Sequence, residues 1–390
     1  MTDQAYDEDD THMVLTQPAA LLARFLFRVS YGFLSRVAMQ FYSTVRSALV
    51  GLYLSAISVA AAPGLSLAIS GSNNFAGVQD FKITTSLVNT GDKALKLLKD
   101  PRTVLSSLPT DRFTISNAEG ASPAFTGARA KFVPEYIVKN NIEDAFVVLE
   151  PGASFELEHD LSTSYNFTAP GEGAYDIRAN NLFLYVDPTT NEIVELQATE
   201  EAPLTASFTG TLSNARRHAK RVTYRSCSST RQSQLVSAAR AAASYASSAA
   251  SYLSSHTSST TRYVSWFGTY SSGRHATVLK HFNAIKGCPF SGSVTYDCSC
   301  TDSGTYAYVY RDDFGVIYLC GAFWSAPNTG TDSRGGTLVH ESSHFTAVAD
   351  TDDVVYGQSG ARSLARSNPA NAIRNADSHE YFAENNPAES

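Results

Sequence analysis

Residues 340–344 read His-Glu-Ser-Ser-His, and this short string constrains the chain more than any other feature of the sequence. On an α-helix, residues four positions apart share a face, so the imidazoles of His340 and His344 could bind one metal ion. Glu341 would then lie beside the open coordination position, where a carboxylate can act as a general base. The spacing predicts a short helix that carries the metal site of a metal-dependent peptidase.

The residues just before the string are compatible with the start of a helix. Thr337 offers a cap, and Leu338 and Val339 add apolar side chains that a helix could bury. The alternative interpretation is a surface helix with two solvated histidines. This local context favours the metal site.

A catalytic zinc ion takes three protein ligands and keeps the fourth position for water, so a third ligand is required. The metzincin pattern would need Gly at position 347 and His at position 350, where this chain has Ala347 and Asp350, which excludes that class. The remaining candidates are acids downstream, either in a later helix as in the gluzincins or close to the string: Glu380, Glu384, Asp350, Asp352 and Asp353. Spacing alone does not choose among them.

The stretch from His340 to Gly357, H-E-S-S-H-F-T-A-V-A-D-T-D-D-V-V-Y-G, resembles the aspzincins, a family of secreted fungal zinc proteases. That family includes deuterolysin and peptidyl-Lys metalloendopeptidase, and it joins H-E-x-x-H to a downstream G-T-x-D-x-x-Y-G whose Asp is the third ligand. The resemblance implies one zinc ion per chain, bound by His340, His344 and Asp353. One departure is Asp350, which stands where the family has Gly.

The similarity continues through residues 371–387 and back to about Cys227, and it is strongest to the lysine-specific branch. It implies that the Tyr356 hydroxyl donates a hydrogen bond to the oxyanion of the transition state. It also implies that Asp377 and Glu380 line an acidic pocket for the lysine after the scissile bond. Without the resemblance, two acids three residues apart would indicate a solvated helix face.

Lysine usage gives a separate indication of specificity. From Val222 to Ser390 the chain has two lysines, Lys280 and Lys286, against ten arginines, whereas seven lysines precede Val222. A protease that cuts at lysine benefits from having few lysines of its own, although drift or codon bias would give the same pattern. The depletion is confined to the predicted enzyme.

The chain has five cysteines, and all of them lie in its C-terminal part: Cys227, Cys288, Cys298, Cys300 and Cys320. This asymmetry predicts a disulfide-bearing domain that follows a different kind of segment. The family resemblance implies the pairs Cys227 with Cys298 and Cys300 with Cys320, and it leaves Cys288 unpaired. No C-x-x-C string supports a second metal site.

The N-terminal residues predict secretion. Residues 1–38 begin with an acidic segment that has the wrong charge for a signal peptide, and we treat them as an extension of doubtful origin. Residues 39–62 have a basic start at Arg46, an apolar run and small residues before Pro63, as signal peptides do. Arginines interrupt the apolar runs of this region, so no stable membrane anchor is expected after processing.

Residues 63–221 have the alternating pattern of β-strands and predict a β-rich propeptide, a small antiparallel sandwich. The strands at 181–186 and 192–196 flank a turn and predict a hairpin. Lys220 and Arg221 end a basic linker in which a processing protease could separate the propeptide from residues 222–390. This propeptide is the expected internal partner of the enzyme; a carbohydrate- or protein-binding module is the alternative.

Residues 222–390 predict an α+β domain, with helices at 232–256 and 275–285, strands at 296–300, 305–310 and 316–320, and then the metal-binding helix. The net charge of −7 argues against nucleic acid as a partner. The chain is therefore expected to be a secreted zinc endopeptidase, made as a zymogen, that cuts proteins or peptides on the amino side of lysine. A broad-specificity deuterolysin-like neutral protease and a non-catalytic secreted zinc-binding protein are the alternatives.

Overall fold

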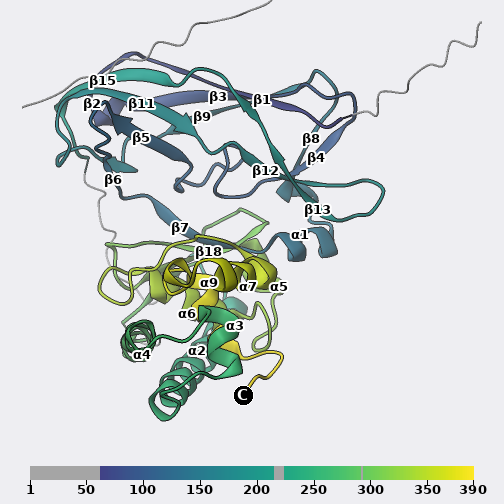
Figure 1. Ribbon diagram of the computed structural model, residues 1–390, viewed down its shortest axis with the longest axis vertical. Helices are drawn as coiled ribbons and strands as arrows, with labels where there is room; N and C mark the ends of the chain where they lie inside the picture. The colour runs from purple at the N-terminus through teal and green to yellow at the C-terminus, as the bar shows by residue number, and fades with distance from the viewer. Residues whose placement is uncertain (1–61, 215–223, 291–292) are drawn as a thin grey trace, which may run out of the picture. The chain divides into compact units, whose positions relative to one another are not determined.

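The computed structural model describes residues 62–214, 224–290 and 293–390, which form a mixed arrangement of sheets and helices (Figure 1). The N-terminal extension, the predicted signal peptide up to Ala61, and the predicted processing residues Lys220 and Arg221 lie outside the described residues. Within the described part of the chain, no helix has the length and apolar character that a membrane crossing requires.

Strands make up most of the regular secondary structure in the described residues up to 214, as the alternating pattern predicts. Along β3 (Lys82–Asn89) every second side chain is buried, which is the two-residue period of a strand with one face against a core. The other strands are β1 (Leu65–Gly71), β2 (Asn74–Gly77), β4 (Leu95–Leu98), β5 (Phe113–Asn117), β6 (Ala124–Phe125), β7 (Ala128–Phe132), β8 (Phe146–Leu149), β9 (Ser154–Asp160), β10 (Tyr165–Asn166), β11 (Gly173–Ala179), β12 (Leu182–Val186), β13 (Ile193–Gln197), β14 (Thr199–Glu200) and β15 (Leu204–Thr211). One α-helix, α1 (Pro134–Asn140), interrupts them.

These strands form sheets of order β14-β1-β3-β9, β2-β15-β11-β5 and β13-β12-β4-β8, with β10 paired to β6. Residues of the three four-stranded sheets contribute to one hydrophobic core, in which Phe167 stacks on Phe208 with ring centroids 4.2 Å apart. The predicted hairpin is confirmed, since β12 and β13 pair antiparallel across a turn at Asp187. Most strand pairs in this part are antiparallel, as predicted, and the exceptions are β1 with β14 and β15 with β2, which pair in parallel.

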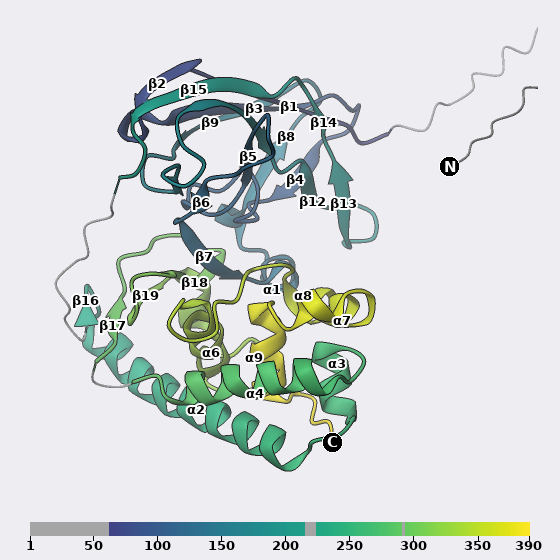
Figure 2. The same ribbon diagram turned by 60° about the vertical axis from the view of Figure 1, so that its left-hand side comes forward.

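One strand of residues 62–214 belongs to a sheet whose other strands follow residue 223. β7 is the outer strand of the five-stranded sheet β16-β17-β19-β18-β7, whose other strands follow residue 223 (Figures 1 and 2). Those strands are β16 (Tyr224–Arg225), β17 (Thr295–Asp297), β18 (Thr305–Tyr310) and β19 (Val316–Leu319). The pairing of β7 with a strand after residue 223 could not be predicted from the sequence, because pairing between distant segments leaves no local pattern.

The helices after residue 223 share a second hydrophobic core with the inner strands of this sheet. They are α2 (Ser229–Ser255), α3 (Thr261–Phe267), α4 (Ser272–Lys286), α5 (Gly321–Ser325), α6 (Arg334–His344), α7 (Gly357–Ser367), α8 (Pro369–Ala372) and α9 (Ala376–Glu384). The long α2 is rich in alanine and buries one alanine-lined face, and its first turn is capped by the Ser228 hydroxyl. The predicted helices at 232–256 and 275–285 correspond to α2 and α4.

The helix that contains the His-Glu-Ser-Ser-His string is α6, and its cap differs from the predicted one. The Ser333 hydroxyl accepts a hydrogen bond from the Gly336 amide, which makes Ser333 the N-cap, whereas Thr337 lies inside the helix. Glu384 of α9 accepts hydrogen bonds from the Ser333 amide and hydroxyl at 2.8 and 2.7 Å. The start of α6 is thereby fixed to the C-terminal helix.

Two disulfides lie near the strands of the five-stranded sheet. Cys227 pairs with Cys298 and Cys300 pairs with Cys320, which are the two pairs implied by the family resemblance. Cys288 is a free thiol whose pKa burial raises to about 11, so it is protonated at neutral pH. Cys288 is therefore a poor nucleophile in this structure.

Candidate active site

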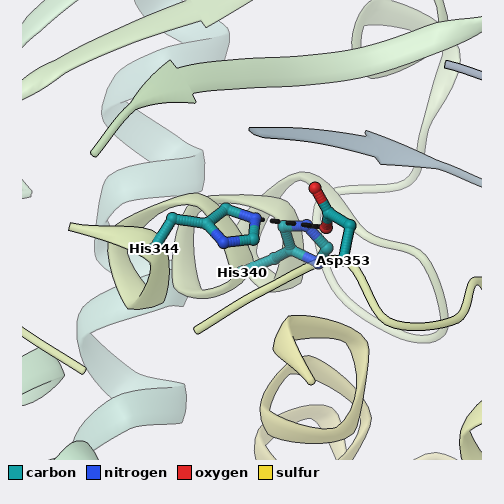
Figure 3. Close-up of side chains that lie close together, drawn as sticks. All are labelled: His340, His344 and Asp353. Carbon is teal, nitrogen blue, oxygen red and sulfur yellow. Dashed lines mark ion pairs between the residues drawn. The ribbon is translucent and has the colours of Figure 1, made fainter. Parts of the chain in front are cut away.

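Helix α6 and the loop after it bring together two histidines and one aspartate. His340 and His344 lie one helical turn apart and are fully buried, and the Nε2 atom of each lies 3.2 Å from Oδ1 of Asp353 (Figure 3). Asp353 reaches this position from the segment between α6 and α7. Of the five acids that spacing left open, Asp353 is the one in contact with both Nε2 atoms.

These residues fit a metal ion. Nε2 of His340, Nε2 of His344 and Oδ1 of Asp353 are all buried, and none of the three has a hydrogen-bond partner in the described structure. Buried polar atoms without partners are costly, and three such atoms converging on one point have the arrangement of a metal-ligand set. Burial raises the pKa of Asp353, but the neighbouring His344 and His340 lower it by more. The pKa of Asp353 is therefore well below its ordinary value, and its carboxylate is anionic.

The other ring nitrogen of each histidine is also fixed. Nδ1 of His344 lies 2.9 Å from the Thr351 carbonyl, which can only accept, so Nδ1 carries the proton and the Nε2 lone pair is free. Nδ1 of His340 lies 2.9 Å from Oδ1 of Asp377 and 3.3 Å from Oε2 of Glu380. Carboxylates behind a ligating histidine orient its ring and raise its basicity.

His340, Asp377 and Glu380 are close enough together to count as a second possible metal group. We interpret them as supporting groups because they share His340 with the first set and because both acids have other partners. Oδ2 of Asp377 accepts a hydrogen bond of 2.7 Å from the Gly357 amide. Asp377 therefore links His340 to the start of α7.

The departure from the family pattern at Asp350 has a conformational explanation. Asp350 has φ of 54°, in the left-handed region where glycine is favoured and aspartate is tolerated. Its carboxylate is bound by the Arg311 guanidinium, whose Nε donates across 3.0 Å. Asp350 thus adopts a backbone conformation that glycine would also adopt, and its carboxylate binds Arg311 and not His340 or His344.

Glu341 and Tyr356 lie on either side of one peptide group. Oε1 of Glu341 accepts a hydrogen bond of 3.2 Å from the Lys131 amide, and the Tyr356 hydroxyl donates one of 2.8 Å to the Ala130 carbonyl. Burial raises the pKa of Glu341 to about 8, with Asp353 acting in the same direction and His340 against it. A pKa near neutrality suits a group that must accept a proton and later return it.

The side chain of Lys131 is buried beside these groups among acidic and aromatic side chains, and we call this environment the acidic pocket. Its ammonium lies 2.6 Å from Oε2 of Glu380 and 3.2 Å from Oδ1 of Asp332, and the Lys131 side chain is 0% exposed. Although burial opposes it, Glu380 and Asp332 raise the pKa of Lys131 well above its ordinary value, so the charge is retained.

The two predicted pocket acids thus have different neighbours. Glu380 contacts the Lys131 ammonium, whereas Asp377 contacts the His340 ring and the Gly357 amide. Asp332, which also accepts a hydrogen bond of 2.7 Å from the Tyr381 hydroxyl, was not among the predicted residues. It precedes the helix cap and belongs to no motif, so only the fold reveals it.

Replacing Asp353 by alanine should remove bound metal, because this removes one of the three converging donors. We expect the metal affinity to fall by more than the roughly 10- to 100-fold loss that follows removal of a supporting residue. Asp350→Gly is the matched control, since glycine suits the positive φ and the side chain faces Arg311. Metal analysis of both purified variants checks this, and a metal-free Asp350→Gly protein beside a metal-loaded Asp353→Ala protein would refute the assignment.

Comparison with known proteins identifies the family of this chain. Residues 252–384 match the sequence profile of a family described as lysine-specific metallo-endopeptidase, the aspzincins. A peptidyl-Lys metalloendopeptidase of Armillaria mellea is 53% identical over 345 residues, which cover 88% of this chain and 97% of the relative. A protein of the same name from Grifola frondosa is 51% identical over 352 residues, covering 90% and 100%. An extracellular protease of Aeromonas hydrophila is 32% identical over 332 residues, covering 80% and 89%.

Proposed function

This chain belongs to the aspzincin family and is a metalloendopeptidase, and we propose that it uses zinc to cut peptide bonds on the amino side of lysine. One observation carries the specificity: a buried lysine ammonium lies 2.6 Å from Glu380, and the amide nitrogen of the same lysine donates to Glu341. Glu380, which we propose recognises lysine, and Glu341, the proposed proton carrier, therefore both contact Lys131. The names of the two fungal relatives agree with this specificity.

His340, His344 and Asp353 are the proposed zinc ligands, with Asp377 holding the His340 ring from behind. A zinc ion in this position supplies Lewis acidity, which lowers the pKa of a water molecule and polarises the substrate carbonyl. Two imidazoles and one carboxylate are a donor set that suits zinc.

Glu341 is the proposed general base and acid. It takes a proton as water attacks the carbonyl carbon and passes that proton to the leaving amine, whose position corresponds to the Lys131 amide in this structure. Tyr356 is the proposed oxyanion donor, because its hydroxyl already donates to a carbonyl next to that amide.

The pocket supports selection of lysine over arginine. Glu380 and Asp332 meet one ammonium at 2.6 and 3.2 Å, and the Tyr306 and Tyr381 rings lie 5.1 and 5.4 Å from it. A compact ammonium fits between these groups, whereas a planar guanidinium needs more room and a different set of acceptors. We propose Asp332 as a member of the pocket together with Glu380 and Asp377.

The precursor organisation is part of the proposal. Residues 39–62 would be a signal peptide, residues 63–221 a propeptide with a β-sandwich, and residues 222–390 the secreted enzyme, released near Lys220 and Arg221. The two disulfides suit an oxidising compartment, and the Aeromonas relative is named an extracellular protease.

A broad-specificity neutral protease would share the metal ligands, and a non-catalytic zinc-binding protein would share the histidines. The acidic pocket argues against the first and the placement of Glu341 against the second. The test is a digest of a mixed protein sample, with mass spectrometry of the new N-termini. We expect most of them to begin with lysine, and a broad range of first residues would instead support the neutral protease.

A further inference from the structure

A segment of the N-terminal half lies against the candidate active site in the way a bound peptide would. β7 pairs antiparallel with β18, with Lys131 opposite Ala307 and Ala130 opposite Tyr308, and all five residues of β7 are buried (Figure 2). Adding an extended peptide to the edge of a sheet is a recurring mode of peptide binding. The sheet order leaves β18 at the edge once β7 is removed.

The main chain of this segment contacts the residues assigned to catalysis. The Ala130 carbonyl accepts from the Tyr356 hydroxyl at 2.8 Å, and the Lys131 amide donates to Glu341 at 3.2 Å. The Ala130 amide donates to Oδ2 of Asp353 at 2.8 Å, which leaves Oδ1 of Asp353 facing the histidines. One peptide bond, between Ala130 and Lys131, therefore has its carbonyl at the oxyanion donor and its nitrogen at the proton carrier.

The side chain after that bond is the one that the pocket selects. Lys131 enters the acidic pocket with its ammonium on Glu380 and Asp332. Cleavage on the amino side of lysine requires this register, with lysine supplying the nitrogen of the bond that breaks. A shift of one residue would point the lysine to the other face of the strand.

Two arginines of the N-terminal half, one of them in β7, contact the loop that carries Asp353 and Tyr356 independently of Lys131. Arg129 forms ion pairs with Asp111 at 3.2 Å and with Asp352, next to the third ligand, at 3.0 Å. The Arg102 guanidinium lies 4.3 Å above the Tyr356 ring and donates to the Val354 carbonyl at 3.4 Å. The ion pairs of Arg129, the residue before Ala130, help to fix the placement of the Ala130–Lys131 bond.

We propose that the segment around Ala130 and Lys131 is bound in the precursor as a substrate and blocks the active site. The peptide bond between these two residues is then the one at which the enzyme first cuts its own chain. The proposal rests on the lysine specificity proposed above and adds an internal processing site. Water adds to the Ala130 carbonyl carbon and the bond to the Lys131 nitrogen breaks, leaving a carboxylate on Ala130 and an amine on Lys131. Glu341 carries the proton from the water to that nitrogen, with which it already shares a hydrogen bond.

The test follows fragments of the full chain after secretion, by N-terminal sequencing and mass spectrometry. The unaltered chain should yield a fragment that begins at residue 131, and no fragment should begin at residue 131 in Lys131→Met or in Glu341→Gln. Lys139→Met is the matched control, because Lys139 is an exposed lysine on α1 of the same half of the chain. The control should yield the Lys131 fragment at the normal rate.

A second measurement uses the unaltered chain, so it does not depend on whether Lys131→Met folds. If the bound segment is cut by its own enzyme, the first-order rate at which the Lys131 fragment appears should not change across a dilution series. A rate that falls with dilution would mean cleavage between molecules and would overturn the proposal. The same fragment arising from Glu341→Gln alone would also overturn it, because another protease would then be responsible.

A reporter peptide with a single lysine separates this proposal from the proposed function. A preparation that cuts the reporter before lysine but never forms the Lys131 fragment overturns self-cleavage and leaves the lysine specificity in place. A preparation that does neither contradicts the proposed function as well. Reporter cleavage together with the Lys131 fragment supports both.

Discussion

Glu341→Gln should leave the metal bound and the fold intact while removing nearly all peptidase activity. The change deletes the proposed proton acceptor and touches none of the three proposed metal ligands His340, His344 and Asp353. General acid–base catalysis contributes roughly 100- to 10,000-fold to rate, so kcat should fall by about that factor. Glutamine nearly keeps the shape of the side chain, and its amide oxygen can still accept the hydrogen bond that Glu341 accepts from the Lys131 amide.

Glu389→Gln is the matched control, because Glu389 pairs with Arg362 at 3.0 Å and is not among the residues of the site. The two variants should have equal metal content and similar melting temperatures, and the control should keep its activity. Near-normal turnover by Glu341→Gln would show that another group carries the proton. Loss of metal from that variant would instead mean that Glu341 helps to hold the ion.

Removing the charges of the lysine pocket should abolish the preference for lysine with less effect on metal content. In Glu380→Gln and Asp332→Asn the ammonium of a bound lysine loses one or both of its anionic partners. Hydrogen bonds to charged groups contribute about 1.5–3 kcal/mol, so kcat/KM for lysine should fall roughly 10- to 100-fold for each change. Cleavage before uncharged residues should fall much less, and the digest profile should broaden.

Asp377→Asn is the informative comparison because Asp377 contacts His340 and the Gly357 amide, whereas the ammonium of Lys131 contacts Glu380 and Asp332. If Asp377 acts mainly behind His340, this variant should lose metal affinity more than it loses preference for lysine. If it belongs to the pocket in the way the family resemblance implies, the digest profile should broaden as it does for Glu380→Gln. A Glu380→Gln enzyme that still cuts only before lysine would show that the selectivity arises elsewhere.

The parts of the site that the sequence predicts are those determined by short spacings. The separation of His340 and His344 defines one face of one helix, and the family pattern identifies Asp353 by its distance from the string. The same pattern explains Asp350, whose positive φ keeps the turn that a glycine normally makes. Ligand spacing and turn conformation can be predicted from the sequence because a few residues close together in the chain determine them.

The parts that could not be predicted depend on contacts between distant segments. Asp332 enters the pocket only because α6 and α9 pack together, and Ser333 rather than Thr337 caps α6 because Glu384 binds it from α9. The placement of Lys131 depends on β7 leaving its own half of the chain to pair with β18. The five residues of β7 contain no local pattern that identifies the strand with which they pair. Hydrophobic periodicity could therefore not predict the pairing of β7 with β18.

Because β18 becomes the edge of its sheet once β7 is removed, the proposed binding mode also determines which lysines of other proteins can be cut. A substrate must take the place of β7 and pair with β18, so it must be extended over about five residues. A lysine inside a helix has its backbone hydrogen bonds satisfied within that helix and can pair with β18 only after local unfolding. The enzyme should therefore cut denatured proteins quickly and native ones at their loosest segments, so that the local stability of the substrate determines the order in which its lysines are cleaved.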